Sequence, residues 1–346
     1  MTGLRFGVFD HLDADGLPLG AFYENRLKLV EAYERAGLYG YHTAEHHATP
    51  LGMCPSPSVL HAAIAQRTRT LRFGPLVYTL ALYHPLRLAE EICMLDHLSG
   101  GRFQLGIGRG ISPFELGYFG ADPAEAQARY IEAWSVITRA FAGGRLTHEG
   151  PHFKFEDVPI QMQPQQRPHP PLWYGLGDPA AIGWCVANRV NVVSNAPLQA
   201  TRTITDRYRE AWAAAGQAPG ALPLMGMTRH TVIAPSQAEA LDIARRAYRR
   251  WYASFMYLWE LRGGKPPFAA YPPEIDELLA AGRALVGTPA QVAEAIEAQA
   301  GASGISYLLL RFAFGDLSPA ESMRSLGLFA AAVRPRLATS PSAPAP

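Results

Sequence analysis

The sequence predicts an α/β fold built on a parallel β-sheet, and three observations support this. Strand-like apolar runs alternate with helix-like runs along most of the chain, and such alternation implies parallel strands. The 346 residues fit one (β/α)₈ barrel of about 250 residues with insertions. Polar motifs follow several strands where those strands end, and in an α/β barrel these ends face one pocket. Alternation alone leaves open whether the sheet is closed or open.

The first half of the chain predicts four strands separated by three helices. The strands are expected at residues 4–9, 39–44, 71–79 and 103–107, and the helices at 24–36, 58–67 and 85–98. In the third helix Leu88, Ile92 and Leu95 recur at helical spacing, and Pro85 can open it.

A recurring helix-start signal organises the second half of the chain. A capping residue followed by proline and, two residues later, Glu or Gln occurs at residues 122–125, 288–291 and 318–321, and residues 178–179 give half of it. The first of these predicts a helix to about Phe141. Further strands are expected at residues 172–174, 191–193, 224–233 and 305–310, which completes a set of eight.

Three segments depart from the strand–helix unit. Residues 143–171 are rich in proline and predict a loop excursion with a small hairpin. Residues 262–287 are too long for a plain connection and predict a lid over an active site. Residues 337–346 are rich in Pro, Ala and Ser and predict a disordered tail. Residues 1–336 are expected to form a single domain.

Composition argues against several classes of protein. The 31 basic and 30 acidic residues nearly cancel, which argues against nucleic acid or an anionic membrane as the main partner. The cysteines, Cys54, Cys93 and Cys185, lack the spacing of a disulfide framework or zinc site. No apolar run approaches the roughly 20 residues of a membrane helix, and the N-terminus lacks a signal-peptide pattern. A soluble cytoplasmic protein is therefore expected.

The Glu45-His46-His47 motif follows the second predicted strand. Adjacent side chains point in different directions, so one histidine is expected to enter the pocket. There it can exchange a proton near neutral pH, and a neighbouring carboxylate can orient it or stabilise its charge. Two ordinary loop histidines are the alternative. No further ligand at a suitable spacing supports a metal site.

Two glycine-rich motifs allow a ligand to approach the backbone closely. In residues 106–110 (GIGRG) the forked guanidinium of Arg109 suits a phosphate, although a glycine-rich turn with a surface arginine is the alternative. The spacing is not that of a dinucleotide-binding fingerprint. Residues 173–179 (WYGLGDP) lead from a strand into a helix start, which suits an anion. The carboxylate of Asp178 favours a plain helix cap there instead.

These motifs together resemble the bacterial luciferase-like family of flavin-dependent monooxygenases. The resemblance rests on residues 44–47 (AEHH), on the apolar strand and His84-Pro85 that follow, and on residues 90–110 (EEICMLDHLSGGRFQLGIGRG). It extends along most of the chain, to the ending at residues 314–335 (FGDLSPAESMRSLGLFAAAVRP). The family implies a TIM-type barrel that binds FMN, or in some branches a deazaflavin, at the carboxyl ends of its strands.

The resemblance also implies roles for individual residues. His46 matches an active-site acid/base, flanked by Glu45 and His47, and Arg109 matches the arginine that holds the flavin phosphate. Leu76 and Val77 fall where members often have a non-proline cis peptide beneath the flavin ring. The other expected flavin contacts are Gly108, Gly110, Gly177 and Asp178. The substrate pocket is expected to be lined by Phe9, Tyr78, Arg229 or His230, and Arg311 or Phe312.

The chain departs from the family pattern at two places. Luciferases have a reactive cysteine at the position of Gly108, and glycine is expected to leave room over the flavin and to weaken any case for light emission. Relatives place hydroxyl residues where this chain has Asp178 and Ala181. This change should weaken FMN binding, which would suit a protein that receives reduced flavin from a separate reductase.

The resemblance therefore implies a two-component monooxygenase. It would use reduced FMN from a flavin reductase together with O₂, and would oxidise a small organic substrate through a C4a-peroxyflavin. A deazaflavin-dependent hydride-transfer enzyme on the same barrel is one alternative, and a non-catalytic flavin-binding subunit is another. A homodimer packed through the early helices is also implied.

Overall fold

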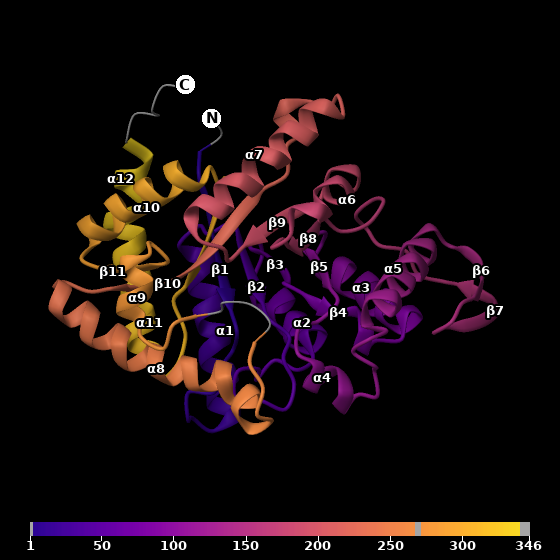
Figure 1. The fold of residues 1–346 in the computed structure, drawn as a ribbon, viewed down its shortest axis with the longest axis horizontal. Coiled ribbons are helices and arrows are strands. Elements are labelled where there is room, and N and C mark those ends of the chain that lie inside the picture. The colour runs from indigo at the N-terminus through magenta and orange to yellow at the C-terminus, as the bar shows by residue number, and fades with distance from the viewer. Residues whose placement is uncertain (1–2, 267–270, 340–346) are drawn as a thin grey trace.

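A computed structural model describes residues 3–266 and 271–339 and shows a ring of parallel strands surrounded by helices (Figure 1). The ring strands, in order, are β1 (Arg5–Asp10), β2 (Gly40–Thr43), β3 (Arg72–Pro75) with its continuation β4 (Tyr78–Thr79), β5 (Leu105–Gly108), β8 (Leu172–Gly175), β9 (Asn191–Ser194), β10 (Met225–Ile233) and β12 (Tyr307–Arg311). Each pairs in parallel with the next, and β12 pairs with β1. The ring closes, which confirms the TIM-type (β/α)₈ barrel.

The third predicted strand is split in two. Residues 71–79 were expected to be continuous, but the Leu76–Val77 peptide is cis and separates β3 from β4. The two parts lie very close to β5. A Cβ added to Gly74 would lie 1.9 Å from the carbonyl oxygen of Gln104. A Cβ added to Gly106 would lie 2.0 Å from the carbonyl oxygen of Pro75. Only glycine fits this separation of the two backbones.

The longer helices cover the outside of the ring. They are α1 (Leu19–Arg35), α2 (Pro57–Arg67), α3 (Pro85–Leu98), α5 (Ala126–Ala142), α7 (Leu198–Ala214), α8 (Gln237–Leu261), α10 (Pro289–Ser303) and α11 (Pro319–Leu328), with shorter α4 (Pro113–Tyr118), α6 (Ile182–Ala187), α9 (Ile275–Ala280) and α12 (Arg334–Thr339). The capping boxes at Thr288 and Ser318 are confirmed. The one at Asp122 was wrong in detail, because Asp122 accepts from the Ala124 amide in a turn before α5 begins.

The insertions are more structured than loops. Residues 143–171 carry the antiparallel hairpin β6 (Gly144–Glu149) and β7 (Lys154–Ile160), as expected, and it projects from the barrel beside α5 (Figure 1). Residues 262–287 contain α9 and β11 (Ala284–Gly287), which pairs with β10 outside the ring. Residues 267–270 of that segment lie outside the described residues. No described helix is both long enough and apolar enough to cross a membrane.

The C-terminal end differs from the expected disordered tail. Residues 337–339 complete α12, whereas residues 340–346 of the expected tail lie outside the described residues.

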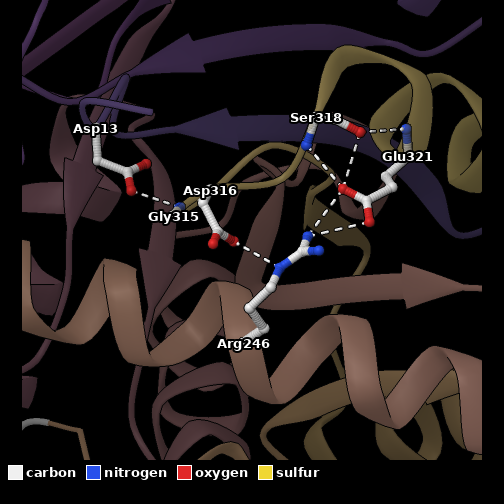
Figure 2. A network of polar contacts seen from close by, with 6 residues as sticks. All are labelled: Asp13, Arg246, Gly315, Asp316, Ser318 and Glu321. Carbon is white, nitrogen blue, oxygen red and sulfur yellow. Dashed lines mark hydrogen bonds and ion pairs between the residues drawn. The ribbon is translucent and has the colours of Figure 1, made fainter. Parts of the chain in front are cut away.

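An ion-pair network fixes the loop after β12 to the surrounding helices (Figure 2). Arg246 on α8 donates from Nε to Asp316 at 3.0 Å and from Nη2 to the Glu321 carboxylate at 2.9 Å. The same carboxylate accepts from the backbone amide of Ser318 at 2.8 Å. One glutamate therefore closes the capping box of α11 and ties that helix to α8.

Asp13 connects the loop after β1 to the loop after β12 (Figure 2). Its Oδ2 accepts from the Gly315 amide at 2.5 Å, and its side chain is fully buried. Burial raises the pKa of Asp13 to about 7, with Arg26 opposing and Asp10 adding to this shift. A buried carboxyl group therefore holds together two of the loops at the carboxyl end of the barrel.

The raised pKa of Asp13 predicts a pH-dependent stability. An aspartate in the unfolded chain titrates near pH 4, so between about pH 4 and 7 the unfolded chain loses a proton that the folded protein keeps. Stability then falls as the pH rises through this window. Between about pH 4 and 7, we expect the free energy of unfolding of Asp13→Asn to fall by up to about 4 kcal/mol less than that of the wild-type protein.

Urea unfolding at pH 4, 5.5 and 7 measures the effect. Asp242→Asn, which changes an exposed carboxylate on α8, is the control and should keep the wild-type slope. A wild-type slope in Asp13→Asn would contradict the assignment of this pH dependence to Asp13.

Candidate functional site

The carboxyl ends of the ring strands surround a cavity of about 370 Å³, a size found for small-molecule sites. The wall is formed by Phe9 and His11 after β1, residues 44–46 after β2, residues 76, 77 and 79 at β4, residues 107–111 after β5, Glu115 and Gln127, Tyr174 and Gly175 of β8, Val193 and Asn195 at β9, and Thr228 of β10. Every ring strand except β12 thus contributes to the wall through its own residues or those just after it.

His46 lines this cavity and is held by Glu115 on α4. Its Nδ1 lies 3.1 Å from Glu115 Oε1. Burial alone would lower the pKa of His46, but the Glu115 and Glu45 carboxylates outweigh burial and raise it. With Nδ1 occupied by Glu115, Nε2 remains for a ligand, so His46 can hold a proton at the cavity wall and exchange it with a reacting group.

Glu115 was missed in the sequence, although a signal for it existed. Residues 112–115 read Ser-Pro-Phe-Glu, the same helix-start pattern found at Ser318. The Ser112 hydroxyl accepts from the Glu115 amide and caps α4. The first turn of this short helix therefore sets the position of the Glu115 carboxylate.

Glu45 and His47 form a second pair beside the first. His47 Nε2 lies 2.9 Å from Glu45 Oε1, and Glu45 Oε2 accepts from the Thr79 amide at 3.1 Å. The Glu45 side chain is fully buried, and the His47 ring packs on Phe119 at 4.6 Å. Glu45 thus ties the loop after β2 to β4, whereas His47 points away and lies outside the cavity lining.

Arg109, in contrast to the buried Glu45, is exposed. Its Nε donates to the Gly110 carbonyl oxygen at 3.2 Å, and both residues line the cavity. Gly175 lines it too, and a Cβ added there would meet nothing within 4 Å. The backbone at Gly175 is therefore open to a ligand.

The cis Leu76–Val77 peptide and Gly108 form part of the same wall. A Cβ at Gly108 would lie 2.4 Å from Val77 Cγ2. The expectation that Gly108 leaves free room was therefore wrong, because the Val77 side chain fills that space.

Gly177 and Asp178 lie outside the cavity lining. Asp178 Oδ1 accepts from the Ala180 amide at 2.9 Å and caps the short 3₁₀ helix Pro179–Ala181. The carboxylate is thus used in a local cap, which was the alternative interpretation of this motif.

Three of the expected substrate-pocket residues face away from the cavity. Tyr78 is buried outside the ring, where its hydroxyl lies 2.8 Å from Ser58 Oγ. Arg229 donates from Nε to Gln299 on α10 at 2.7 Å. Phe312 packs against Tyr33 and Phe329. The expectation for Tyr78 was wrong. Of the alternatives Arg229 or His230 and Arg311 or Phe312, the first pair is met by His230 and the second by Arg311. Successive side chains of a strand face opposite sides, and the sequence did not fix which side.

The other pocket residues lie at or directly behind the wall. Phe9 lines the cavity. Arg311 donates from Nη2 to the hydroxyl of Thr228, a wall residue, at 2.9 Å, and His230 Nε2 lies 3.3 Å from Arg311 Nη1. Within residues 3–266 and 271–339, no group of three His, Cys, Asp or Glu side chains is arranged to hold a metal ion.

Comparison with known proteins identifies the family. The model of the luciferase-like monooxygenases matches residues 4–306. An uncharacterised protein of Sinorhizobium fredii is 44% identical over 314 residues, 91% of this chain and 92% of that protein. The oxygenase component of a flavin-dependent trigonelline monooxygenase from Acinetobacter baylyi is 31% identical over 193 residues, 55% of this chain and 53% of that protein.

A solved structure shows that the fold is shared over nearly the whole chain. The crystal structure of a monooxygenase from Streptomyces bottropensis superposes with a TM-score of 0.85 at 27% identity, covering 96% of this chain and 99% of that one. The cavity at the carboxyl ends of the strands, the family match and this superposition lead to one conclusion: the chain belongs to the luciferase-like monooxygenase family.

Proposed function

We propose that this protein is the oxygenase component of a two-component monooxygenase, which uses reduced FMN from a separate reductase and O₂ to oxidise a small organic molecule. The observation that carries the proposal is that one cavity holds Arg109, the Leu76–Val77 peptide and the His46–Glu115 pair. The Acinetobacter baylyi relative supports it, since that protein is named as a flavin-dependent oxygenase component.

The residues of the cavity fit FMN. Arg109 offers an exposed guanidinium for the phosphate, and the open backbone at Gly175 lets a ligand approach the same wall. Leu76 and Val77 supply an apolar surface for a flat ring. When bound, reduced FMN would supply the electrons that activate O₂. Asp178 caps a local 3₁₀ helix and offers no hydrogen-bond donor to a phosphate, so loose binding and exchange with a reductase are part of the proposal.

His46 is proposed as the acid/base, and Glu45 and His47 as groups that position its loop. The raised pKa keeps His46 protonated to higher pH than an ordinary histidine, so it can donate a proton to an atom in the cavity. Glu45 acts through the Thr79 amide, which fixes the loop after β2 against β4. Exclusion of water by residues 262–287 remains a proposal, supported by the 3.1 Å contact of Arg283 with the carbonyl oxygen of Asn195 at the wall.

We expect the wild-type protein to bind reduced FMN in an anaerobic titration, and Arg109→Met to weaken this binding roughly 10- to 100-fold, the effect of losing a charged hydrogen bond. Riboflavin, which lacks the phosphate, is the matched ligand and should bind both proteins alike.

A reduced deazaflavin is titrated in parallel. Binding of the deazaflavin alone would replace the monooxygenase proposal with hydride transfer, and binding of neither would favour a non-catalytic subunit.

The Glu115 carboxylate is predicted to set the pKa of His46. We expect Glu115→Gln to lower this pKa, because the carboxylate that favours the imidazolium is removed. Histidine NMR against pH measures the change. Glu45→Gln is the comparison and should lower the pKa less, since Glu45 contributes less to the shift. If His46 is the acid, the pH dependence of kcat for any compound turned over should move in the same direction. An unchanged profile would exclude this role.

A homodimer packed through α2 and α3 is proposed from the apolar side chains that these helices expose, Val59, Met94 and Leu98. We expect the wild-type protein to sediment as a dimer and Met94→Glu to sediment as a monomer. Ile131→Glu, at an exposed apolar position on α5, should leave the dimer intact. A monomeric wild-type protein would contradict this part of the proposal.

A further inference from the structure

Arg311 is a buried cation whose hydrogen-bond partners within residues 3–266 and 271–339 are all neutral. Only 2% of the residue is exposed. It donates to the Thr228 hydroxyl at 2.9 Å and to the Tyr271 hydroxyl at 3.2 Å, and lies 3.3 Å from His230 Nε2. Its Nε has no partner in the described part of the chain. A buried charge without a counter-charge is costly, so this arrangement calls for an explanation.

Aromatic rings offset only part of that cost. The guanidinium lies over Phe9 at 5.1 Å, Trp251 at 5.6 Å and Tyr271 at 5.6 Å. Each cation–π contact is weak, and together these contacts recover less than the cost of removing a charge from water. The rings exclude water without neutralising the charge.

The neighbours of Arg311 make the region more positive rather than less. Burial, Arg311, Arg283 and Arg229 all lower the pKa of His230 well below its ordinary value. Burial and then Arg311 do the same to His11. Both histidines are therefore neutral near pH 7, and arginine supplies the formal charge around them.

A chain of hydrogen bonds connects Arg311 to the cavity surface. Arg311 donates to the Thr228 hydroxyl, which donates to Asn195 Oδ1 at 2.5 Å. Thr228 and Asn195 both line the cavity, as do Phe9 and His11, and Asn195 is exposed. Successive hydrogen bonds polarise one another, so the Asn195 amide presents a positive end to whatever occupies the cavity.

The carboxylates of the cavity wall are already engaged. Glu115 pairs with His46, and Glu45 pairs with His47. If the phosphate of FMN is held by Arg109, as proposed above, the charge of Arg311 is still unmatched. We infer that the substrate carries a carboxylate that binds at the Asn195–Thr228–Arg311 end of the cavity. This inference rests on the proposed function and deepens it by naming the class of substrate.

A carboxylate on an apolar, aryl-sized body fits this end best. One guanidinium acting through one amide suits a singly charged, planar anion. Phe9 and Val193 supply apolar surface in the same cavity as Asn195 and Thr228. The predicted substrates are therefore aryl carboxylates rather than neutral terpenes or aldehydes.

Calorimetric titration of the full chain with matched probes tests the inference. The probes are benzoate and 1-naphthoate with the corresponding neutral amides, measured with and without saturating FMN. We expect the wild-type protein to bind each carboxylate at least tenfold more tightly than its amide. Arg311→Met should abolish this preference and retain FMN binding, whereas Arg109→Met should retain the preference and weaken FMN.

A second pair of variants keeps the test decisive if Arg311→Met does not fold. Thr228→Val and Asn195→Leu interrupt the hydrogen-bond chain and leave Arg311 in place, and each should reduce the carboxylate preference at least threefold. Equal binding of carboxylates and amides by the wild-type protein would overturn the inference, as would a preference that survives Arg311→Met.

Benzenesulfonate is a further probe. Tighter binding of benzenesulfonate than of benzoate would overturn the choice of carboxylate. Failure of the flavin proposal gives a different result. A wild-type protein that binds no flavin yet prefers carboxylates would refute FMN use and support the anion site.

Discussion

The close approach of β5 to β3 and β4 is the constraint on which the barrel and its cavity depend. Gly74 and Gly106 allow the two backbones to touch, because any side chain at either position would collide with a carbonyl oxygen of the facing segment. The contact closes the ring through the Phe73–Phe103 bridge and the pairing of β4 with β5. It also places Val77 in the space beside Gly108, and Thr79 where its amide reaches Glu45. The cis Leu76–Val77 peptide, Arg109 and the Glu45-His46-His47 loop thus share one wall because two strands are nearly in backbone contact.

Around that wall, charges are arranged in pairs, and the exceptions are informative. Glu45 with His47 and Glu115 with His46 form neighbouring carboxylate–imidazole pairs, and the shared contact of Glu115 with the His47 amide couples them. Burial disfavours the charged form of His46, and the carboxylates reverse that preference. Among the described residues no carboxylate pairs with Arg109, which follows β5, or with Arg311, the last residue of β12. We expect a cavity built this way to favour ligands with negative charge at two places.

Much of the fold could be predicted from the sequence, because it depends on local patterns. Alternating apolar periodicity gave the ring strands, and the helix-start signals at Thr288 and Ser318 became real capping boxes. The same helix-start pattern occurs at Ser112. It was not recognised in the sequence, and Glu115 in the first turn of that helix was therefore missed. Tyr78 was misassigned, and two pocket positions were left as alternatives, for another reason. Which of two adjacent side chains enters a barrel depends on strand register, and a one-residue change reverses every side chain. The length of segment 262–287 predicted a lid, but no local pattern indicated that β11, only four residues long, would pair with β10 outside the ring.

The two ends of the cavity differ in how far sequence reasoning can reach them. Arg109 and His46 lie in short motifs directly after their strands, so a linear pattern is enough to find them. The environment of Arg311 is assembled from Phe9, Thr228, Trp251 and Tyr271, which are far apart in the chain and meet only in the folded barrel. Whether an arginine has a counter-charge is a property of that assembly and leaves no local signal. For this reason the resemblance of the chain to its family points to the cofactor end, whereas the chemistry of the substrate has to be inferred from the unmatched charge at the other end.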